Sequence, residues 1–399
     1  FTDTSDYLNV KYECKCFDQL LSKGCLQEIK IPPHGSRLVT IQCPVDQKLS
    51  IRELPIRLRL IYQKNRSQGL LKDGELLGFD QICMGREELA ASYYASISEN
   101  QNQDQQNQDH NQYQDKYQDQ KHESCENKTI QCMEQESTYL VDIGLIQYTF
   151  SKRTGLPVSI VKDGRELLLE PVQYHTYRAP TDNDRTIKEE WIKAGYDRNR
   201  VRVYESDLIE ENEAIRIHFT ISLAAVSIQP FLRAEVVWKI AQDGMLALEM
   251  KVRREKDFPY LPRFGLLFKL PYEAGEKVTY YGYGPVESYI DKHRASYIDL
   301  FESSASQLHN DYIKPQENGS HYQCAYLKAG DFECFGAPYY DMNVSHYETK
   351  ELAGKKHNYE LEESDATYIC TDYRNSGIGS GSCGPQLIKD YRLDQEDKI

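Results

Sequence analysis

The sequence of 399 residues lacks the features that mark several large classes of protein. No segment approaches the roughly 20 consecutive apolar residues of a membrane-spanning helix. The first residues, FTDTSDYLNVKYE, lack the basic and apolar regions of a signal peptide. We therefore expect a soluble, cytoplasmic protein with no membrane partner. Phe1 leads directly into a strand pattern, which indicates a chain cut close to a domain edge.

Positive charge is also scarce. Asp and Glu number 62 against 48 Lys and Arg, which gives a net charge of −14, and no dense basic stripe offsets the excess of acids. Binding to a nucleic-acid backbone depends on such a basic face. Nucleic acid is therefore excluded as the expected partner.

A cysteine framework is missing as well. The eleven cysteines are odd in number and irregularly spaced, which favours a reduced setting over a disulfide scaffold. Cys14 and Cys16 are expected on one side of a strand because they lie two residues apart. No second Cys or His pair follows at zinc-finger spacing. We assign no metal site and no cofactor to this chain.

What the sequence does contain is a large number of short β-strand patterns. In residues 1–92, apolar and polar residues alternate in runs such as 8–12, 26–31, 38–42 and 56–62, separated by turn signals such as Pro32-Pro33-His34-Gly35. This spacing predicts a small antiparallel β-sandwich. Residues 93–136 are rich in Gln and Asn and almost free of aliphatic side chains, so we expect a solvated linker or insertion.

Residues 137–399 continue the strand pattern over a longer stretch. Alternating runs occur at 140–143, 147–150, 201–204, 216–221, 233–238, 246–252 and 266–270. Only residues 187–194 have a helical pattern. So many strands in one undivided segment predict a large two-sheet sandwich, and the fold class of the whole chain is all-β.

Three phrases in this region combine Gly or Pro with acidic, amide or aromatic side chains. They are YRAPTDND at 177–184, YGPVESYID at 283–291 and PQENG at 315–319. Such mixtures are more typical of shaped polar surfaces than of strand interiors. Two further segments accompany them, LPRFG at 261–265 and GIGSGSCGP at 377–385.

In this order and at these separations, the five segments resemble the C-terminal domain of the β-galactosidases of glycoside hydrolase family 2. Residues 1–92 resemble the domain that precedes it in those enzymes. The resemblance implies an immunoglobulin-like β-sandwich followed by a supersandwich of the galactose mutarotase-like type. It also implies that catalysis belongs to a (β/α)₈ barrel, whose alternating strand and helix pattern is absent here.

The resemblance implies the partners too. They are the barrel portion of the enzyme, on the same chain or on a separate large subunit, and a galactoside substrate. Mg and Na are expected only on the barrel, and the complete enzyme is expected to be an oligomer. This chain alone is expected to be inactive.

The same resemblance assigns one set of residues, and the turn chemistry of the phrases predicts a second. The rim of the substrate pocket, including a mobile loop at 185–188, is implied for Asp182, Asn183, Asp184, Arg185, Ser382, Cys383 and Gly384. Some relatives have Trp where Cys383 stands, giving the sugar a face to stack on; the alternative for Cys383 is a small buried residue. A structural role is expected for Arg178, Pro180, Glu287, Tyr289, Asp291, Glu317, Asn318 and Gly319. Among these, Glu317 is expected to accept from backbone donors and Gly319 to take a positive φ.

Catalytic carboxylates are not assigned to this chain. Retaining hydrolysis needs two carboxyl groups roughly 5 to 5.5 Å apart. Asp182 and Asp184 point the same way if their segment is extended, but turn formation beside Arg178 is favoured for them. The Asn212-Glu213 pair lies in a charged turn, where a solvated surface role is favoured.

Two other functions stay open on the sequence. One is a free-standing carbohydrate-binding module. The other is an aldose epimerase, which needs an acid and a base such as Glu with His. His309, His321 and His346 are available for it, although single histidines on polar strands are more often surface residues.

Overall fold

The computed structural model describes residues 4–26, 29–42, 55–84, 90, 93–95, 130–211 and 214–394. The chain divides into two compact units, Phe1–Gln101 and Asn102–Ile399. All strand pairings within the described ranges are antiparallel, which confirms the all-β class.

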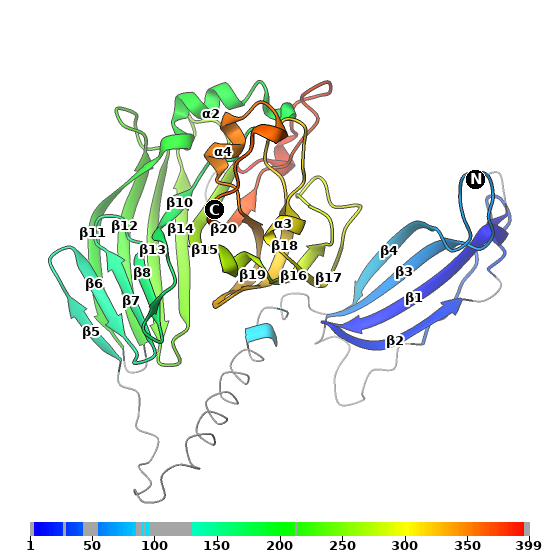
Figure 1. Cartoon of the computed structure of the whole chain (residues 1–399), viewed down its shortest axis with the longest axis horizontal. Helices are drawn as coiled ribbons and strands as arrows, with labels where there is room; N and C mark the ends of the chain where they lie inside the picture. Colours follow the sequence, from blue (N-terminus) through cyan, green and yellow to red (C-terminus); the bar gives the residue numbers. More distant parts are fainter. Residues whose placement is uncertain are drawn as a thin grey trace, which may run out of the picture. The chain divides into compact units, whose positions relative to one another are not determined.

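The described part of the first unit forms one four-stranded sheet in the order β2-β1-β3-β4, drawn in blue in Figure 1. Its strands are β1 (Leu8–Cys16), β2 (Gln19–Leu26), β3 (Ile56–Lys64) and β4 (Leu76–Met84), after a short 3₁₀ turn η1 (Ser5–Tyr7). A second sheet is not among the residues described here. The immunoglobulin-like sandwich therefore stays a prediction.

Two expectations in the first unit need correction. Residues 29–42 form a turn and irregular backbone instead of strands, and the Pro-rich turn closes through a hydrogen bond from Gly35 N to Pro32 O at 2.9 Å. Cys14 is disulfide-bonded and fully buried, while Cys16 is a buried free thiol. The two cysteines share one strand face as predicted, but they are not a pair of free thiolate ligands.

The described part of the second unit contains three sheets and a few short helices. The seven-stranded sheet has the order β10-β15-β20-β19-β18-β16-β17, the four-stranded sheet β11-β12-β13-β14 and the five-stranded sheet β5-β6-β7-β8-β9. The first group of strands is β5 (Gln131–Glu134), β6 (Thr138–Asp142), β7 (Ile146–Ser151), β8 (Pro157–Lys162), β9 (Arg165–Glu166) and β10 (Glu170–His175). The second group is β11 (Arg200–Glu210), β12 (Ala214–Ala224), β13 (Leu232–Ala241), β14 (Leu246–Arg254) and β15 (Arg263–Pro271).

The remaining elements lie in the last third of the chain or in connections. The strands are β16 (Val278–Gly284), β17 (Tyr297–Ser303), β18 (Ser320–Ala329), β19 (Phe332–Ser345) and β20 (Ala366–Asn375). The α-helices are α2 (Lys188–Ala194), α3 (Ala305–Leu308) and α4 (Thr349–Gly354). The 3₁₀ turns are η3 (Asp182–Asp184), η4 (Tyr196–Arg198), η5 (Tyr272–Gly275), η6 (Asn358–Glu360) and η7 (Lys389–Tyr391).

Alternation of side chains explains why these strands form and face each other. Along β13 the inward residues are buried and the intervening ones are exposed or half-buried, as period-two patterning predicts. Aromatic contacts join the five- and four-stranded sheets: the rings of Phe150 and Trp238 lie 5.5 Å apart, and those of Tyr139 and Phe219 lie 6.1 Å apart. One continuous core of buried residues includes side chains from all three sheets.

Helix α2 confirms the helical prediction and ends where the sequence allows it. Gly195 takes a left-handed φ of 80°, and its N–H donates to the carbonyls of the last turn. An added Cβ on Gly195 would lie 2.2 Å from the Cβ of Ala225. The left-handed conformation of Gly195 ends the helix, and the missing side chain lets this turn pack closely against Ala225, directly after β12.

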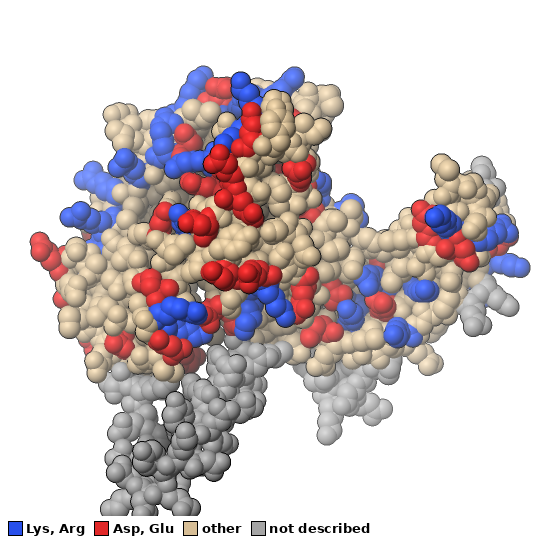
Figure 2. All heavy atoms as spheres, viewed as in Figure 1, with Lys and Arg blue, Asp and Glu red and all other residues tan. Residues whose placement is uncertain are grey.

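The surface agrees with the low basic content of the sequence. On the face shown in Figure 2, acidic and basic side chains of the second unit are interspersed, with several Asp and Glu gathered across its middle. None of the helices in the described ranges is long and apolar enough to cross a membrane.

Candidate functional site

The three phrases of the sequence meet in one place. They form the loops after β10, after β16 and before β18, and they contact the loop after β20. The backbone N–H of Glu317 donates to Ala179 O at 2.9 Å, and that of Ser288 donates to Ser320 O at 2.7 Å. We call residues 177–188, 284–293, 310–319 and 376–385 the loop cluster. Several of these loops lie together near the top of the second unit in Figure 1, beside α2.

A buried ion pair lies within the first loop. Arg178 is fully buried, and its Nε and Nη2 donate to the carboxylate of Asp184 at 3.1 and 2.8 Å. Its Nη1 and Nη2 also donate to the carbonyls of Ser376 and Gly377 at 2.7 and 3.0 Å. The same carboxylate accepts from Thr181 N at 2.9 Å. Arg178 thus joins the loop after β10 to the loop after β20 by charge-assisted hydrogen bonds.

Asn183 makes a second connection between these two loops. Its Nδ2 donates to Gly379 O at 2.8 Å, and its Oδ1 accepts from Ser382 N at 3.0 Å. Asp291 supports the same turn from the other side by accepting from the N–H groups of Ile378 and Gly379 at 2.9 and 2.7 Å. The shape of the turn before Cys383 therefore depends on two side chains that are distant in the sequence.

Glu287 holds the loop before β18. Its carboxylate accepts from Gly319 N at 2.9 Å, from Lys292 Nζ at 2.5 Å and from the Tyr312 hydroxyl. Asn310 Nδ2 donates to it at 3.2 Å. A carboxylate surrounded by four donors is held in one rotamer, a geometry that agrees with the structural role predicted for Glu287.

Glu317 differs from its prediction. It forms an ion pair with Arg263, at 3.0 Å from Nη1, instead of accepting from backbone donors. Arg263 also pairs with Asp372 at 2.6 Å, and all three groups are buried. Burial raises the carboxyl pKa of both Glu317 and Asp372, whereas Arg263 lowers it. Arg263 lies in the LPRFG segment and Glu317 in the PQENG phrase, so this ion pair links the two segments.

The structure places the other residues of the structural set as follows. Gly319 takes a φ of 68°, and an added Cβ would lie 2.6 Å from Leu308 O. Asn318 is buried and accepts from Asn310 N at 2.9 Å. Tyr289 is fully buried, and its hydroxyl has no hydrogen-bond partner among the described residues. Tyr289 therefore supports the loop by packing.

The residues predicted for the pocket rim divide into two groups. Asp184 is buried against Arg178 and Asn183 is half-buried, so both shape the loops. Asp182, Arg185, Cys383 and Gly384 are exposed, and Ser382 is partly exposed. The alternative of a buried Cys383 is wrong. Whether the exposed group contacts a sugar stays a prediction.

The paired-carboxylate alternative fails on geometry. Residues Asp182–Asp184 form a 3₁₀ turn, not an extended segment, so the two carboxylates do not share a face as they would on a strand. Asp184 is held by Arg178, while Asp182 pairs with Lys314 at 3.1 Å on the surface. The Asn212-Glu213 pair lies outside the described residues.

The three histidines considered for an epimerase have local partners. His321 and His346 are buried, which corrects the expectation of surface residues. The Nδ1 of His321 lies 2.8 Å from Tyr283 O, and burial lowers its pKa to about 4. The His346 ring stacks on Tyr272 with ring centroids 3.9 Å apart, and the His309 ring lies 4.7 Å from that of Tyr347. Within the described ranges, no group of three or more His, Cys, Asp or Glu side chains could hold a metal ion.

A cavity that the sequence did not reveal lies elsewhere in the second unit. It has a volume of about 590 Å³ and is lined by β10, by the start of β11, and by residues near β7 and α4. None of the predicted rim residues lines it. Its residues come from five separate stretches of the chain, so no local motif indicates it.

Comparison with known proteins shows the family to which the chain belongs. Residues 142–399 match the family model described as beta galactosidase small chain. The chain belongs to this family. A β-galactosidase of Actinobacillus pleuropneumoniae is 35% identical over 400 residues, covering 100% of this chain, and one of Staphylococcus xylosus is 33% identical over 279 residues, covering 69%.

The relatives are much longer than this chain. The alignments span 36% of the Actinobacillus protein and 28% of the Staphylococcus protein. Among solved structures, a galactose 1-epimerase from Lactobacillus acidophilus aligns over 70% of this chain and 95% of its own length, with 8% identity and a TM-score of 0.34. A likeness this weak assigns no function.

Proposed function

We propose that this chain is the C-terminal part, or a separately encoded small subunit, of a β-galactosidase of glycoside hydrolase family 2. The complete enzyme hydrolyses terminal β-D-galactosides such as lactose by a retaining mechanism. The observation that carries the proposal is the 35% identity to a β-galactosidase along the whole chain, over about a third of that enzyme's length.

In this proposal the exposed edge of the loop cluster completes the rim of the substrate pocket. Asp182, Arg185 and the turn at 382–384 face solvent, while Arg178, Asn183 and Asp291 fix the backbone that carries them. A rim held by buried ion pairs is pre-organised, so less ordering is needed when substrate binds.

In this proposal the (β/α)₈ barrel, whose pattern this sequence does not contain, carries out the hydrolysis. Retaining hydrolysis needs a carboxylate nucleophile and a carboxyl acid/base about 5 to 5.5 Å apart. Asp184, Glu287 and Glu317 are each engaged by Arg or Lys side chains within this chain. The two catalytic carboxylates, and the Mg and Na ions, are therefore proposed for the barrel, with which this chain forms an interface in an oligomeric enzyme.

Reconstitution tests the proposal. The chain is mixed with the purified barrel-bearing remainder of a β-galactosidase, and nitrophenol release from a nitrophenyl β-galactoside is followed. We expect higher activity than from the remainder alone and a joint peak in size-exclusion chromatography. An equal concentration of an unrelated acidic protein is the control. If the chain neither raises the activity nor elutes together with the remainder, the subunit proposal is wrong.

The isolated chain distinguishes the two alternatives. Calorimetric titration with galactose and lactose tests a free-standing carbohydrate-binding module, for which millimolar or tighter binding is required. Polarimetry of freshly dissolved α-galactose tests an aldose epimerase. We expect neither binding of these two sugars nor faster mutarotation.

A further inference from the structure

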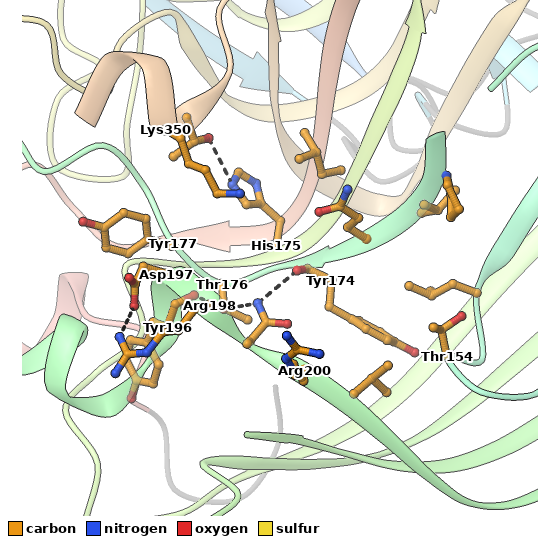
Figure 3. A pocket seen from close by; sticks show the side chains of 18 of the residues that line it. Thr154, Tyr174, His175, Thr176, Tyr177, Tyr196, Asp197, Arg198, Arg200 and Lys350 are labelled. Atoms are coloured by element: carbon orange, nitrogen blue, oxygen red, sulfur yellow. Dashed lines mark hydrogen bonds and ion pairs between the residues drawn. The ribbon is translucent and has the colours of Figure 1, made fainter. Parts of the chain in front are cut away.

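The cavity of about 590 Å³ lies where the edge strand β10 of the seven-stranded sheet approaches the start of β11. Its volume falls within the range of small-molecule sites, roughly 300 to 1,000 Å³. The walls include the apolar side chains of Leu156, Val172 and Leu267 and the ring of Tyr196. Figure 3 shows Tyr174 and His175 on adjacent positions of β10, directed to different parts of the cavity wall.

Three polar atoms at the inner wall lack hydrogen-bond partners among the described residues. They are the hydroxyls of Thr154 and Tyr174 and the Nδ1 of His175. Tyr174 and His175 are more than nine-tenths buried, and in Figure 3 the Tyr174 side chain extends toward Thr154. Each unsatisfied buried group costs about 1–3 kcal/mol, so three such groups on different parts of the lining of one cavity indicate groups that a ligand satisfies.

The inner wall suits hydroxyl groups. Burial lowers the pKa of His175 well below its usual range, so the imidazole is neutral and has one donor and one acceptor nitrogen. Its Nε2 lies 3.3 Å from Thr349 Oγ1, which leaves Nδ1 for another partner. A sugar hydroxyl donates or accepts as required and matches either tautomer. The three polar atoms are almost fully covered, so the binding of a sugar requires these side chains to rotate and expose them.

The outer wall is positively charged. Arg153 and Arg200 line it, are exposed, and have no ion-pair partner in the described ranges. The other cations there are compensated: Arg198 pairs with Asp197 at 2.7 Å, and Lys350 with Glu348 at 3.7 Å. Both guanidinium groups are therefore available to an anion that enters the cavity. Guanidinium binds carboxylate and phosphate oxygens in a bidentate manner.

We propose that this cavity binds a small hydroxylated anion, namely a sugar that carries a phosphate or a carboxylate. The anionic group contacts Arg153 and Arg200, and the sugar hydroxyls contact Thr154, Tyr174 and His175. A neutral sugar leaves the arginines unused, and inorganic phosphate is too small to reach the inner wall at the same time. The site is independent of the proposed role in galactoside hydrolysis.

Isothermal titration calorimetry of the whole chain tests the site. The probes are galactose 6-phosphate, galacturonate, galactose and inorganic phosphate. We expect at least one of the two anionic sugars to bind at least about tenfold more tightly than galactose and phosphate, with affinity that falls as salt rises. The anionic sugar that binds more tightly shows whether the site prefers a phosphate or a carboxylate. Equal binding of galactose, or no binding of either anionic sugar, overturns the proposal.

Substitutions locate the binding. Arg200→Gln is expected to weaken binding of the anionic sugar about tenfold. Arg202→Gln is the control and should leave the affinity unchanged, because Arg202 is exposed on the same strand but does not line the cavity. Tyr174→Phe removes a hydroxyl without a partner in the described residues, so it is expected to weaken sugar binding without lowering the unfolding temperature. Equal effects of Arg200→Gln and Arg202→Gln contradict the site.

Discussion

Replacing Asp184 with asparagine removes the negative charge beside Arg178 without changing the size of the side chain. The carboxylate accepts from Arg178 Nε at 3.1 Å, Arg178 Nη2 at 2.8 Å, Thr181 N at 2.9 Å and Thr181 Oγ1 at 3.1 Å. Arg178 and Asp184 are 0% and 3% exposed. The variant therefore leaves a buried guanidinium without its carboxylate, which costs about 3–5 kcal/mol.

Urea unfolding followed by tryptophan fluorescence measures this cost. Both tryptophans of the chain, Trp191 and Trp238, belong to the second unit, so the signal reports on that unit. Trp191 is a direct reporter, because the Arg178 guanidinium lies 5.5 Å from its ring centroid.

Asp182→Asn is the matched control, two residues away. The Asp182 side chain is 62% exposed and pairs with Lys314 at 3.1 Å, so its loss should cost about 0–1 kcal/mol. Equal losses for the two variants, or a loss below about 1 kcal/mol for Asp184→Asn, would refute the assignment of Arg178 and Asp184 as the buried link between the loops.

Three further predictions concern pH, backbone and activity. Burial raises the pKa of Asp341 from 3.8 to about 7. The protonated carboxyl therefore contributes fully to stability below about pH 4, and this contribution is lost as pH rises through 7. Asp341→Asn should reduce the pH dependence of the free energy of unfolding in urea by up to about 4 kcal/mol. Gly319→Ala adds a Cβ 2.6 Å from a carbonyl and should destabilise by more than Gly164→Ala, where φ is also positive but the space is open and the cost is about 1–2 kcal/mol; equal urea midpoints would contradict the crowding. Asn183→Ala should lower kcat/KM of the reconstituted enzyme about tenfold, and Asn358→Ala, which loses two exposed hydrogen bonds, should not.

Local patterning explains why much of the fold was predictable. Strands β11, β13 and β14 alternate inward and outward residues along most of their length, and α2 has a helical pattern that ends at Gly195. Residues 29–42 misled the prediction because period-two apolar residues do not form a strand where Pro32-Pro33 and a turn interrupt them. Strands β16 to β20 are rich in Tyr, Gly and polar residues, so their alternation was too weak to assign.

The site was predictable only in part because its contacts are long-range. Turn chemistry indicated that Asp184 bonds near its own backbone and to Arg178, six residues away. Nothing local indicated that Arg178 also reaches Ser376, 198 residues later, or that Glu317 pairs with Arg263, 54 residues away. The cavity was missed for the same reason.

The central claim is that this chain completes a β-galactosidase, and a titration tests it most directly. The barrel-bearing remainder is held at a fixed concentration, and the rate of nitrophenol release from a nitrophenyl β-galactoside is measured as the chain is added. The account predicts a rate that rises and saturates near one chain per barrel. A rate that stays flat at every concentration of the chain would contradict it.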